Sequence, residues 1–227
     1  MTAVPWSRSR ATTAPALCGP ARWPDLVRRF LDITVATLAL LLLSPVLLAI
    51  AIAVRADSPG PALLRQQRVG RDRRPFTMLK FRTMCLDGDD LAHRALIAAE
   101  LRGEQTTEDG STKLAHDARI TGCGRFLRAT SLDELPQLIN VLRGEMTLVG
   151  PRPCLPWEAE MFPRQFDDRF TVPPGLTGLW QVRGRSALGT LEMLALDVAY
   201  VSRRSLGGDL RILLLTIPAL LGGGGAR

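Results

Sequence analysis

The chain has 227 residues, which is enough for one compact domain with a sizeable core. Lys and Arg total 29 against 22 Asp and Glu, a net charge of +7, and Lys80 and Lys113 are the only lysines. An arginine excess suits phosphate-rich partners, because guanidinium groups bind phosphate through paired hydrogen bonds. The arginines are scattered and no recognised nucleic-acid motif occurs, so the composition argues against a nucleic-acid partner. The four cysteines form no Cys-x-x-Cys pair, which argues against a disulfide framework.

Residues 1–24 are rich in Pro, Ala, Arg, Ser and Thr and show no hydrophobic period, which is typical of a flexible tail. Residues 33–54 contain no charged side chain, and as one helix they would be roughly 33 Å long, enough to cross a bilayer. Ser44 and Pro45 lie in the middle of this segment, where proline removes a main-chain hydrogen bond and bends a helix. The serine hydroxyl, with water or protein groups, would then satisfy the main-chain groups that the bend frees.

The charges beside this apolar segment predict how it meets a membrane. Arg28 and Arg29 precede it and Arg55 follows it, and positive residues tend to stay on the cytoplasmic side. Each half of the segment would reach only about 15 Å, half the depth of the hydrocarbon core. We therefore predict a re-entrant helix-break-helix with both ends on the cytoplasmic side. The alternative is a kinked helix that spans the membrane.

Residues 62–67 and 75–81 have extended patterns around a turn at residues 69–72, which predicts a short β-hairpin. Its second strand would carry Lys80 and Arg82 on one face, because alternate side chains of a strand point the same way. Two cations placed in this way would hold one phosphate. The alternative is a basic strand face in solvent.

Residues 125–153 contain two adjacent carboxylates, Asp133 and Glu134, with arginines on both sides. Ser131 and Glu134 have the spacing of a helix capping box, and Pro136 suits a first helical turn. Both carboxylates are therefore predicted at a helix N-terminus, where the helix dipole favours negative charge. An aspartate kept ionised there would be able to attack phosphorus or hold a magnesium ion. The alternative is that Glu134 only caps the helix and Asp133 offsets its dipole.

The remaining pattern is mostly helical. Residues 91–101 and 191–201 have helical periods, and Pro151 and Pro153 fix a rigid bend around one arginine. Residues 212–221 are apolar but too short to span a membrane, so we expect them to lie flat at its interface. The predicted fold class is α+β, mostly helical: a small monotopic membrane protein with interfacial amphipathic helices.

From residue 29 to residue 226 the sequence resembles the bacterial sugar transferases of the monotopic phosphoglycosyl transferase family, which are polyprenyl-phosphate sugar-1-phosphate transferases. No single matching segment is specific, but their order and spacing agree throughout. The segments that carry most of the resemblance are Gln67-Arg68-Val69-Gly70, Lys80-Phe81-Arg82-Thr83-Met84, Leu132-Asp133-Glu134-Leu135-Pro136-Gln137, Gly150-Pro151-Arg152-Pro153, Trp180-Gln181-Val182 and Gly184-Arg185-Ser186.

The resemblance implies an enzyme that transfers a sugar-1-phosphate from a UDP-sugar to polyprenyl (undecaprenyl) phosphate, the first membrane step of exopolysaccharide, capsule, O-antigen or glycoprotein glycan assembly. Asp133 matches the family's nucleophile, which forms an aspartyl-phosphosugar intermediate and releases UMP. Glu134 matches its partner in the Mg²⁺ site, so both carboxylates are predicted metal ligands. The positions that match basic or polar residues suited to the substrate are Lys80, Arg82, Arg128, Arg152, Gln181 and Arg185.

The resemblance also implies a division of the chain and a location. We expect a tail at residues 1–24, a re-entrant membrane segment at residues 25–57 with its break at Ser44 and Pro45, and a catalytic domain at residues 58–227. The domain would lie on the cytoplasmic face of the bacterial inner membrane, in contact with membrane lipids. The sequence identifies neither the sugar nor the pathway, and it leaves a homo-oligomer open.

One departure from the family pattern concerns Arg204, which stands where a tryptophan is common, so the local anchoring at the interface is in question. The alternative to an enzyme is a catalytically idle membrane scaffold that binds a nucleotide sugar through its arginines. Such a scaffold would bind a UDP-sugar but release no UMP when polyprenyl phosphate is supplied.

Overall fold

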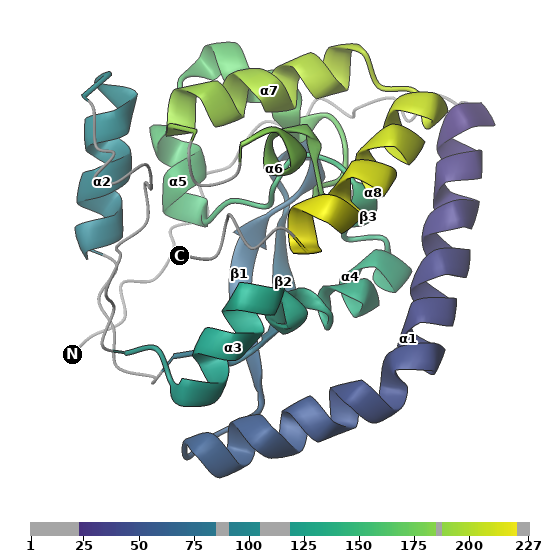
Figure 1. Cartoon of the computed structure of the whole chain (residues 1–227). Helices are drawn as coiled ribbons and strands as arrows, with labels where there is room; N and C mark the ends of the chain where they lie inside the picture. The colour runs from purple at the N-terminus through teal and green to yellow at the C-terminus, as the bar shows by residue number, and fades with distance from the viewer. Residues whose placement is uncertain (1–22, 85–90, 105–118, 185–187, 222–227) are drawn as a thin grey trace.

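The computed structural model describes residues 23–84, 91–104, 119–184 and 188–221, and it is mostly helical with two small sheets (Figure 1). The predicted α+β class is confirmed. In chain order the elements are α1 (Trp23–Asp57), β1 (Leu63–Val69), η1 (Arg71–Arg73), β2 (Pro75–Phe81), α2 (Leu91–Leu101), α3 (Gly122–Thr130), η2 (Leu132–Glu134), α4 (Gln137–Arg143), β3 (Thr147–Val149), α5 (Pro156–Met161), η3 (Arg164–Phe170), β4 (Gly175–Thr177), α6 (Leu179–Arg183), α7 (Thr190–Ser202) and α8 (Leu206–Leu221).

The apolar segment forms one long helix, α1, which bends sharply near its middle so that its two halves run in different directions around the rest of the protein (Figure 1). Pro45 lies inside the helix and leaves the Leu41 carbonyl without its usual N–H partner. The Ser44 hydroxyl donates to that carbonyl at 2.8 Å, as the sequence predicted. The expected break is therefore a bend in a continuous helix. Residues 1–22 of the predicted tail lie outside the described residues, and Trp23 already belongs to α1.

By length and composition α1 could cross a membrane. Its apolar side chains are largely exposed, with Leu41 68% and Leu42 80% accessible. Exposed large apolar side chains continue on α8, at Leu210 and Leu214, and on α3 at Phe126. Exposed apolar side chains in this number are unusual for a soluble surface, and the long exposed apolar helix fits a monotopic membrane protein.

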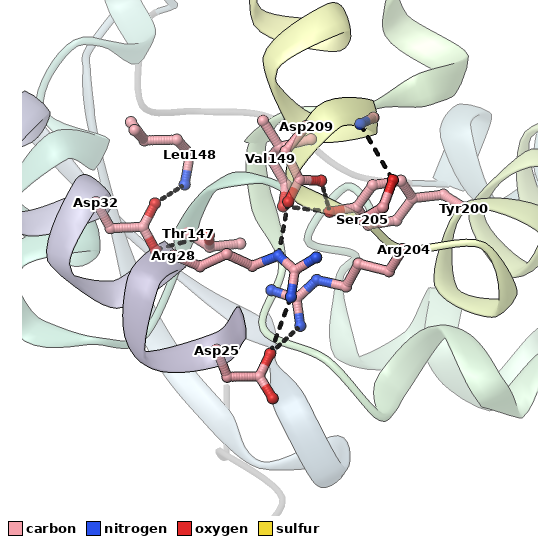
Figure 2. A network of polar contacts seen from close by, with 11 residues as sticks. Asp25, Arg28, Asp32, Thr147, Leu148, Val149, Tyr200, Arg204, Ser205 and Asp209 are labelled. Carbon is pink, nitrogen blue, oxygen red and sulfur yellow. Dashed lines mark hydrogen bonds and ion pairs between the residues drawn. The ribbon is translucent and has the colours of Figure 1, made fainter. Parts of the chain in front are cut away.

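The N-terminal half of α1 is fixed to the domain by buried charges (Figure 2). The Arg28 Nε donates to Asp209 of α8 at 2.6 Å, and the Tyr200 hydroxyl donates to the other oxygen of that carboxylate at 2.7 Å. Arg204 reaches Asp25 at 3.2 Å. Arg204 thus binds the first turn of α1 through an ion pair. We call Asp25, Arg28, Arg204 and Asp209 the anchor network.

The same half of α1 also binds β3 and α4. The buried Asp32 carboxylate accepts hydrogen bonds from the Thr147 hydroxyl at 2.8 Å and the Leu148 N–H at 2.9 Å. Arg29 donates to two carbonyls in the last turn of α4, at 2.6 and 2.7 Å. These contacts attach α4 and β3, which follow each other in the chain, to α1.

The opposite end of α1 binds the same domain. The Asp57 carboxylate accepts the Cys123 N–H at the start of α3, at 3.0 Å. Gly124, one residue on, lies so close to the Thr83 main chain that a Cβ there would meet the Thr83 carbonyl oxygen at 2.1 Å. Both ends of the apolar helix are therefore attached to one folded body.

The predicted hairpin is confirmed. Strands β1 and β2 pair antiparallel, with Leu64 opposite Lys80, Gln66 opposite Met78 and Arg68 opposite Phe76. Directly opposed residues share a face, so Leu64 lies on the same face as Lys80. Alternate residues of a strand also share a face, so Arg68, four residues after Leu64, lies on that face too. Asn140 of α4, which is fully buried, holds β2 by accepting the Leu79 N–H at 3.0 Å.

The second sheet pairs β3 with β4 in parallel. Gly150 and Gly175 come so close that a Cβ on Gly175 would lie 2.1 Å from the Gly150 nitrogen, so only glycine fits there. The Gly175 N–H donates to the Pro151 carbonyl at 2.8 Å. This contact fixes the bend that carries Arg152. Pro151 and Pro153 are both buried, in agreement with their predicted structural role.

The predicted helices at residues 91–101 and 191–201 are confirmed as α2 and α7. The C-terminal apolar helix is longer than predicted, since α8 begins at Leu206 and continues through Pro218. Asp209 in its first turn binds Arg28, which explains why the helix extends into a polar stretch.

Candidate active site

Asp133 and Glu134 lie in η2, a single turn between α3 and α4. Ser131 ends α3 in the left-handed conformation, with φ of 57°. That conformation is uncommon for a residue with a side chain. The next residue, Leu132, packs against the buried cluster of Ile50, Val54, Phe81 and Leu127, and the two carboxylates follow it directly.

The predicted capping box is wrong. The Ser131 side chain makes no capping hydrogen bond to the described residues, and its positive φ differs from the extended conformation that an N-cap requires. Helix α4 begins only at Gln137, after Pro136. The two carboxylates therefore precede α4 by a turn, and Ser131 serves as the end of α3 rather than the start of the next helix.

Asp133 and Glu134 lie in the first turn of η2. Burial raises the pKa of Asp133 to about 6, the neighbouring Glu134 raises it too, and the charges of Lys80 and Arg128 oppose the shift. At neutral pH the carboxylate is still mostly ionised, and it is poorly solvated, a combination that suits a nucleophile.

Lys80 lies near the end of β2 and faces the carboxylates. Burial lowers the pKa of Lys80 to about 8, as do the positive charges of Arg68 and Arg152, whereas Asp133 and Glu134 raise it. Lys80 is half-buried, and the charges of two carboxylates and of two arginines act on it. The sequence predicted that Lys80 would act together with Arg82; it did not predict the proximity of Lys80 to Arg68.

The bend around Arg152 is supported from behind by a buried ion pair. Arg169 donates to Asp197 at 2.8 Å and to the Arg152 carbonyl, also at 2.8 Å. Arg169 and Asp197 are 2% and 1% exposed. The Arg152 side chain itself is exposed and lies over the Trp180 ring, 5.7 Å from its centroid. The buried pair fixes the main chain while the guanidinium stays accessible to an anion.

A small depression of about 260 Å³, partly open to solvent, joins these parts. Its lining comes from β1, β2, η2, α4, the Arg152 bend, β4 and α6: Arg68, Met78, Glu134, Gln137, Arg152, Pro153, Gly175, Leu176 and Gln181. The predicted residues Glu134, Arg152 and Gln181 therefore meet here. Gln181 Nε2 donates to the Leu176 carbonyl at 3.3 Å, and its buried Oε1 accepts no hydrogen bond from the described residues.

Arg82 makes contacts that the sequence did not predict. Its guanidinium donates to the Ser58 carbonyl at 2.7 Å, to the Val54 carbonyl at 3.4 Å and to the Pro59 carbonyl. The last carbonyls of a helix lack partners within the helix, so Arg82 closes the end of α1. It is 3% exposed. These contacts account for Arg82 as a structural residue and separate it from its predicted role beside Lys80.

The donor set fits a magnesium ion. Mg²⁺ is commonly bound by one or two carboxylates together with water and substrate phosphates, and Asp133 and Glu134 are adjacent carboxylates whose mutual repulsion raises the pKa of Asp133. A divalent cation would relieve that repulsion. Among the described residues no group of three or more His, Cys, Asp or Glu side chains is arranged for a metal, so the substrate would have to complete the coordination.

Sequence reasoning missed Arg68 and Gln137 as lining residues. Arg68 belongs to one of the segments of the family resemblance, and its position four residues beyond Leu64, the partner of Lys80, puts it on the same face. The sequence does not give the pairing register of β1 and β2, so the shared face of Arg68 and Lys80 was recognised only in the structure. Gln137 directly follows Pro136 and is 4% exposed. The predicted Arg185 lies outside the described residues.

Comparison with known proteins identifies the family. The family model described as bacterial sugar transferase matches residues 23–223. The chain belongs to the bacterial sugar transferase family. Asp133, Glu134, Lys80 and Arg152 all lie within the matched range.

Curated relatives agree with this family. The chain is 44% identical over 207 residues to the UDP-glucose:undecaprenyl-phosphate glucose-1-phosphate transferase of Caulobacter vibrioides, over 87% of this chain and 70% of that protein. It is 39% identical over 196 residues to the exopolysaccharide production protein ExoY of Rhizobium meliloti, over 86% and 85% of the two chains. It is 40% identical over 203 residues to the galactosyl transferase CpsE of Streptococcus agalactiae, over 89% of this chain but only 44% of that protein. The chain thus spans less than half the length of some of its bacterial sugar transferase relatives.

Proposed function

We propose that this bacterial sugar transferase moves a sugar-1-phosphate from a UDP-sugar to polyprenyl phosphate, and does so through Asp133. The observation that carries the proposal is the placement of two adjacent, half-buried carboxylates, Asp133 and Glu134, near the charges of Lys80 and Arg152. A diphosphate is the kind of ligand that such a cluster of cations binds. The relative from Caulobacter vibrioides is named for UDP-glucose and undecaprenyl phosphate, which supports the same substrate classes.

The chemistry proceeds in two displacements. An Asp133 carboxylate oxygen forms a bond to the sugar-bearing phosphorus while the bond from that phosphorus to the bridging oxygen breaks, and UMP departs with the bonding electron pair. An oxygen of polyprenyl phosphate then attacks the same phosphorus, and the bond to Asp133 breaks and restores the carboxylate. Lys80 and Arg152 lie where they can stabilise the negative charge on the phosphates during both steps.

We further propose that Asp133 and Glu134 hold Mg²⁺, which when bound neutralises diphosphate charge. Chelation with EDTA is then expected to stop transfer, and excess Mg²⁺ to restore it. Recovery with Mg²⁺ but not with Na⁺ at equal ionic strength would distinguish a metal site from simple screening. Full activity in EDTA would contradict this part of the proposal.

The direct test supplies a panel of UDP-sugars to the protein in detergent, with and without polyprenyl phosphate, and follows UMP. Continuous UMP release that needs the lipid phosphate and one particular UDP-sugar is the expected result, and it would also identify the sugar. An idle nucleotide-sugar scaffold would bind the UDP-sugar and release no UMP. The lipid product would place the reaction at the start of a polysaccharide or glycan pathway, as the name of ExoY suggests for that relative.

We propose that the domain lies on the cytoplasmic face of the bacterial inner membrane, with α1 entering and leaving on one side. A straight 35-residue helix would be about 50 Å long and would separate its ends across a bilayer. Here Arg28 and Asp57, near opposite ends of α1, both bind the same folded domain. Reporter tags fused at Met1 and at Arg227 are expected to report the cytoplasm in both cases. Tags on opposite sides would reject the re-entrant arrangement.

A further inference from the structure

Arg68 is a buried cation for which the proposed reaction has so far supplied no role. It is 8% exposed and lies on the hairpin face that also carries Lys80. Its positive charge acts on Lys80, and it lines the depression with Glu134 and Arg152. Arg65, three residues earlier on the same strand, is exposed and lies opposite Leu79 on the other face of the hairpin.

The hydrogen bonds of Arg68 hold its guanidinium in place without neutralising it. Nη1 donates to the Pro153 carbonyl at 3.2 Å and Nη2 donates to the Gln66 side chain at 2.8 Å, and both acceptors are uncharged. Each Nη carries two N–H groups, so these bonds use one of each. Nε is buried and has no hydrogen-bond partner among the described residues.

The carboxylate nearest to Arg68 neutralises it weakly. Glu158 lies 3.8 Å from Nη1, beyond hydrogen-bond distance. The same Glu158 oxygen accepts the Leu155 N–H, and the other oxygen lies 3.6 Å from His93. Burial, and next the charge of Arg152, lower the pKa of Arg68 to about 10. A guanidinium that is desolvated and weakly paired has free energy to gain from an incoming anion.

We propose that Arg68 binds the diphosphate of the donor nucleotide sugar, from the depression that it lines with Arg152 and together with Lys80. This inference rests on the proposed function and adds to it a residue of the donor site. The fixed guanidinium presents its remaining N–H groups to the phosphate oxygens. Arg68 also donates a hydrogen bond to the Pro153 carbonyl, so a donor bound to Arg68 would lie next to the bend that carries Arg152.

The test compares Arg68→Gln and Arg68→Lys with Arg65→Gln as the matched control on the same strand. UDP binding is measured by calorimetry in detergent, and the KM values for the UDP-sugar and for polyprenyl phosphate are measured separately. A hydrogen bond to a charged group is worth about 1.5–3 kcal/mol. Arg68→Gln is therefore expected to weaken UDP binding and raise the donor KM by about 10–100-fold, with the acceptor KM unchanged. Arg68→Lys should recover part of the loss, and Arg65→Gln should behave as wild type.

Two results would overturn the inference. One is UDP binding by Arg68→Gln equal to that of Arg65→Gln. The other is a loss of UDP binding that Arg68→Lys does not recover and that is accompanied by a lower Tm in both Arg68 variants, which would assign Arg68 to folding. The inference and the proposed function can fail separately. If Arg68→Gln weakens UDP binding but the wild-type protein releases no UMP from any UDP-sugar, this inference stands and the proposed function is rejected.

Discussion

The anchor network and the active site each contain a buried arginine, Arg28 and Arg68, but the two differ in their distance to the nearest carboxylate. In the anchor network Arg28 lies 2.6 Å from Asp209, and Arg204 lies 3.2 Å from Asp25 (Figure 2). In the site the carboxylate closest to Arg68 is 3.8 Å away, and Arg152 has no ion-pair partner among the described residues. A buried nitrogen without a hydrogen-bond partner among the described residues does not distinguish the two regions. Arg68 has one in the site, and Arg28 and Arg204 each have one in the anchor network.

The position of the carboxylate therefore decides what each arginine does. A guanidinium with a carboxylate at hydrogen-bond distance is neutralised within the protein, and breaking that pair leaves an uncompensated buried charge. A guanidinium held by neutral carbonyl and amide groups keeps its charge for a ligand. The anchor network consequently stabilises the position of α1, while the site keeps positive charge for the phosphate that we propose it binds. Three predictions test this contrast.

The largest effect is expected from Asp133→Asn, which keeps the shape and removes the nucleophilic carboxylate. Turnover should fall by at least about 10³-fold, as is typical when a covalent nucleophile is removed. UMP release measures the rate, and radiolabelled sugar phosphate retained on the denatured protein measures the intermediate. Asp168→Asn, at an exposed carboxylate, is the matched control. Normal turnover in Asp133→Asn, or label attached to another residue, would show that the site works without this carboxylate.

A second effect concerns the anchor network. Arg28→Met removes the cation but keeps most of the side-chain volume, and it leaves Asp209 buried with only the Tyr200 hydroxyl as a partner. Breaking a buried pair in this way is expected to lower the free energy of unfolding by about 3–5 kcal/mol. Denaturant titration in detergent measures the loss. The exposed Arg203→Met should change it little, and equal stability of the two variants would contradict the role assigned to the network.

The smallest effect is a pH dependence at the site. The pKa of Lys80 is lowered to about 8, and a lysine loses its charge as pH rises through its pKa. The kcat/KM for the UDP-sugar, which reports the free enzyme, should therefore fall about tenfold between pH 7 and pH 9. Lys80→Arg should remove this fall, because a guanidinium stays charged over the whole range. A fall of the same size in Lys80→Arg would assign it to another group.

Much of the architecture followed from local patterns. The uncharged run at residues 33–54, with Ser44 and Pro45 at its centre, predicted a long bent helix and the group that satisfies the freed carbonyl. Alternation around a turn predicted the hairpin, and the period of residues 91–101 predicted α2. In each of these cases a backbone preference or a hydrophobic period within one segment determines the structure, so a single sequence contains the information.

The sequence predicted candidate residues for the site but not their geometry. Residue type and spacing left a structural role open for Asp133, Glu134 and Arg152, and the resemblance to the family favoured a functional one. The capping box was wrong because Ser131 ends α3 in the left-handed conformation, and the next residue, Leu132, packs against a buried cluster whose residues come from α1, β2 and α3. The local sequence is compatible with Ser131 as a helix start or as a helix end. Which of the two forms depends on tertiary packing, which cannot be read from the sequence.

The clearest division between sequence and tertiary structure is the fate of Lys80, Arg82 and Arg68. The sequence by itself determined that cations recur along a β-hairpin in a member of the bacterial sugar transferase family. Only the tertiary structure decided that Arg82 closes the end of α1, while Lys80 and Arg68 face Glu134. The physical reason is that a cation's role depends on the distance to its nearest acceptor, and these acceptors come from segments far away in the chain.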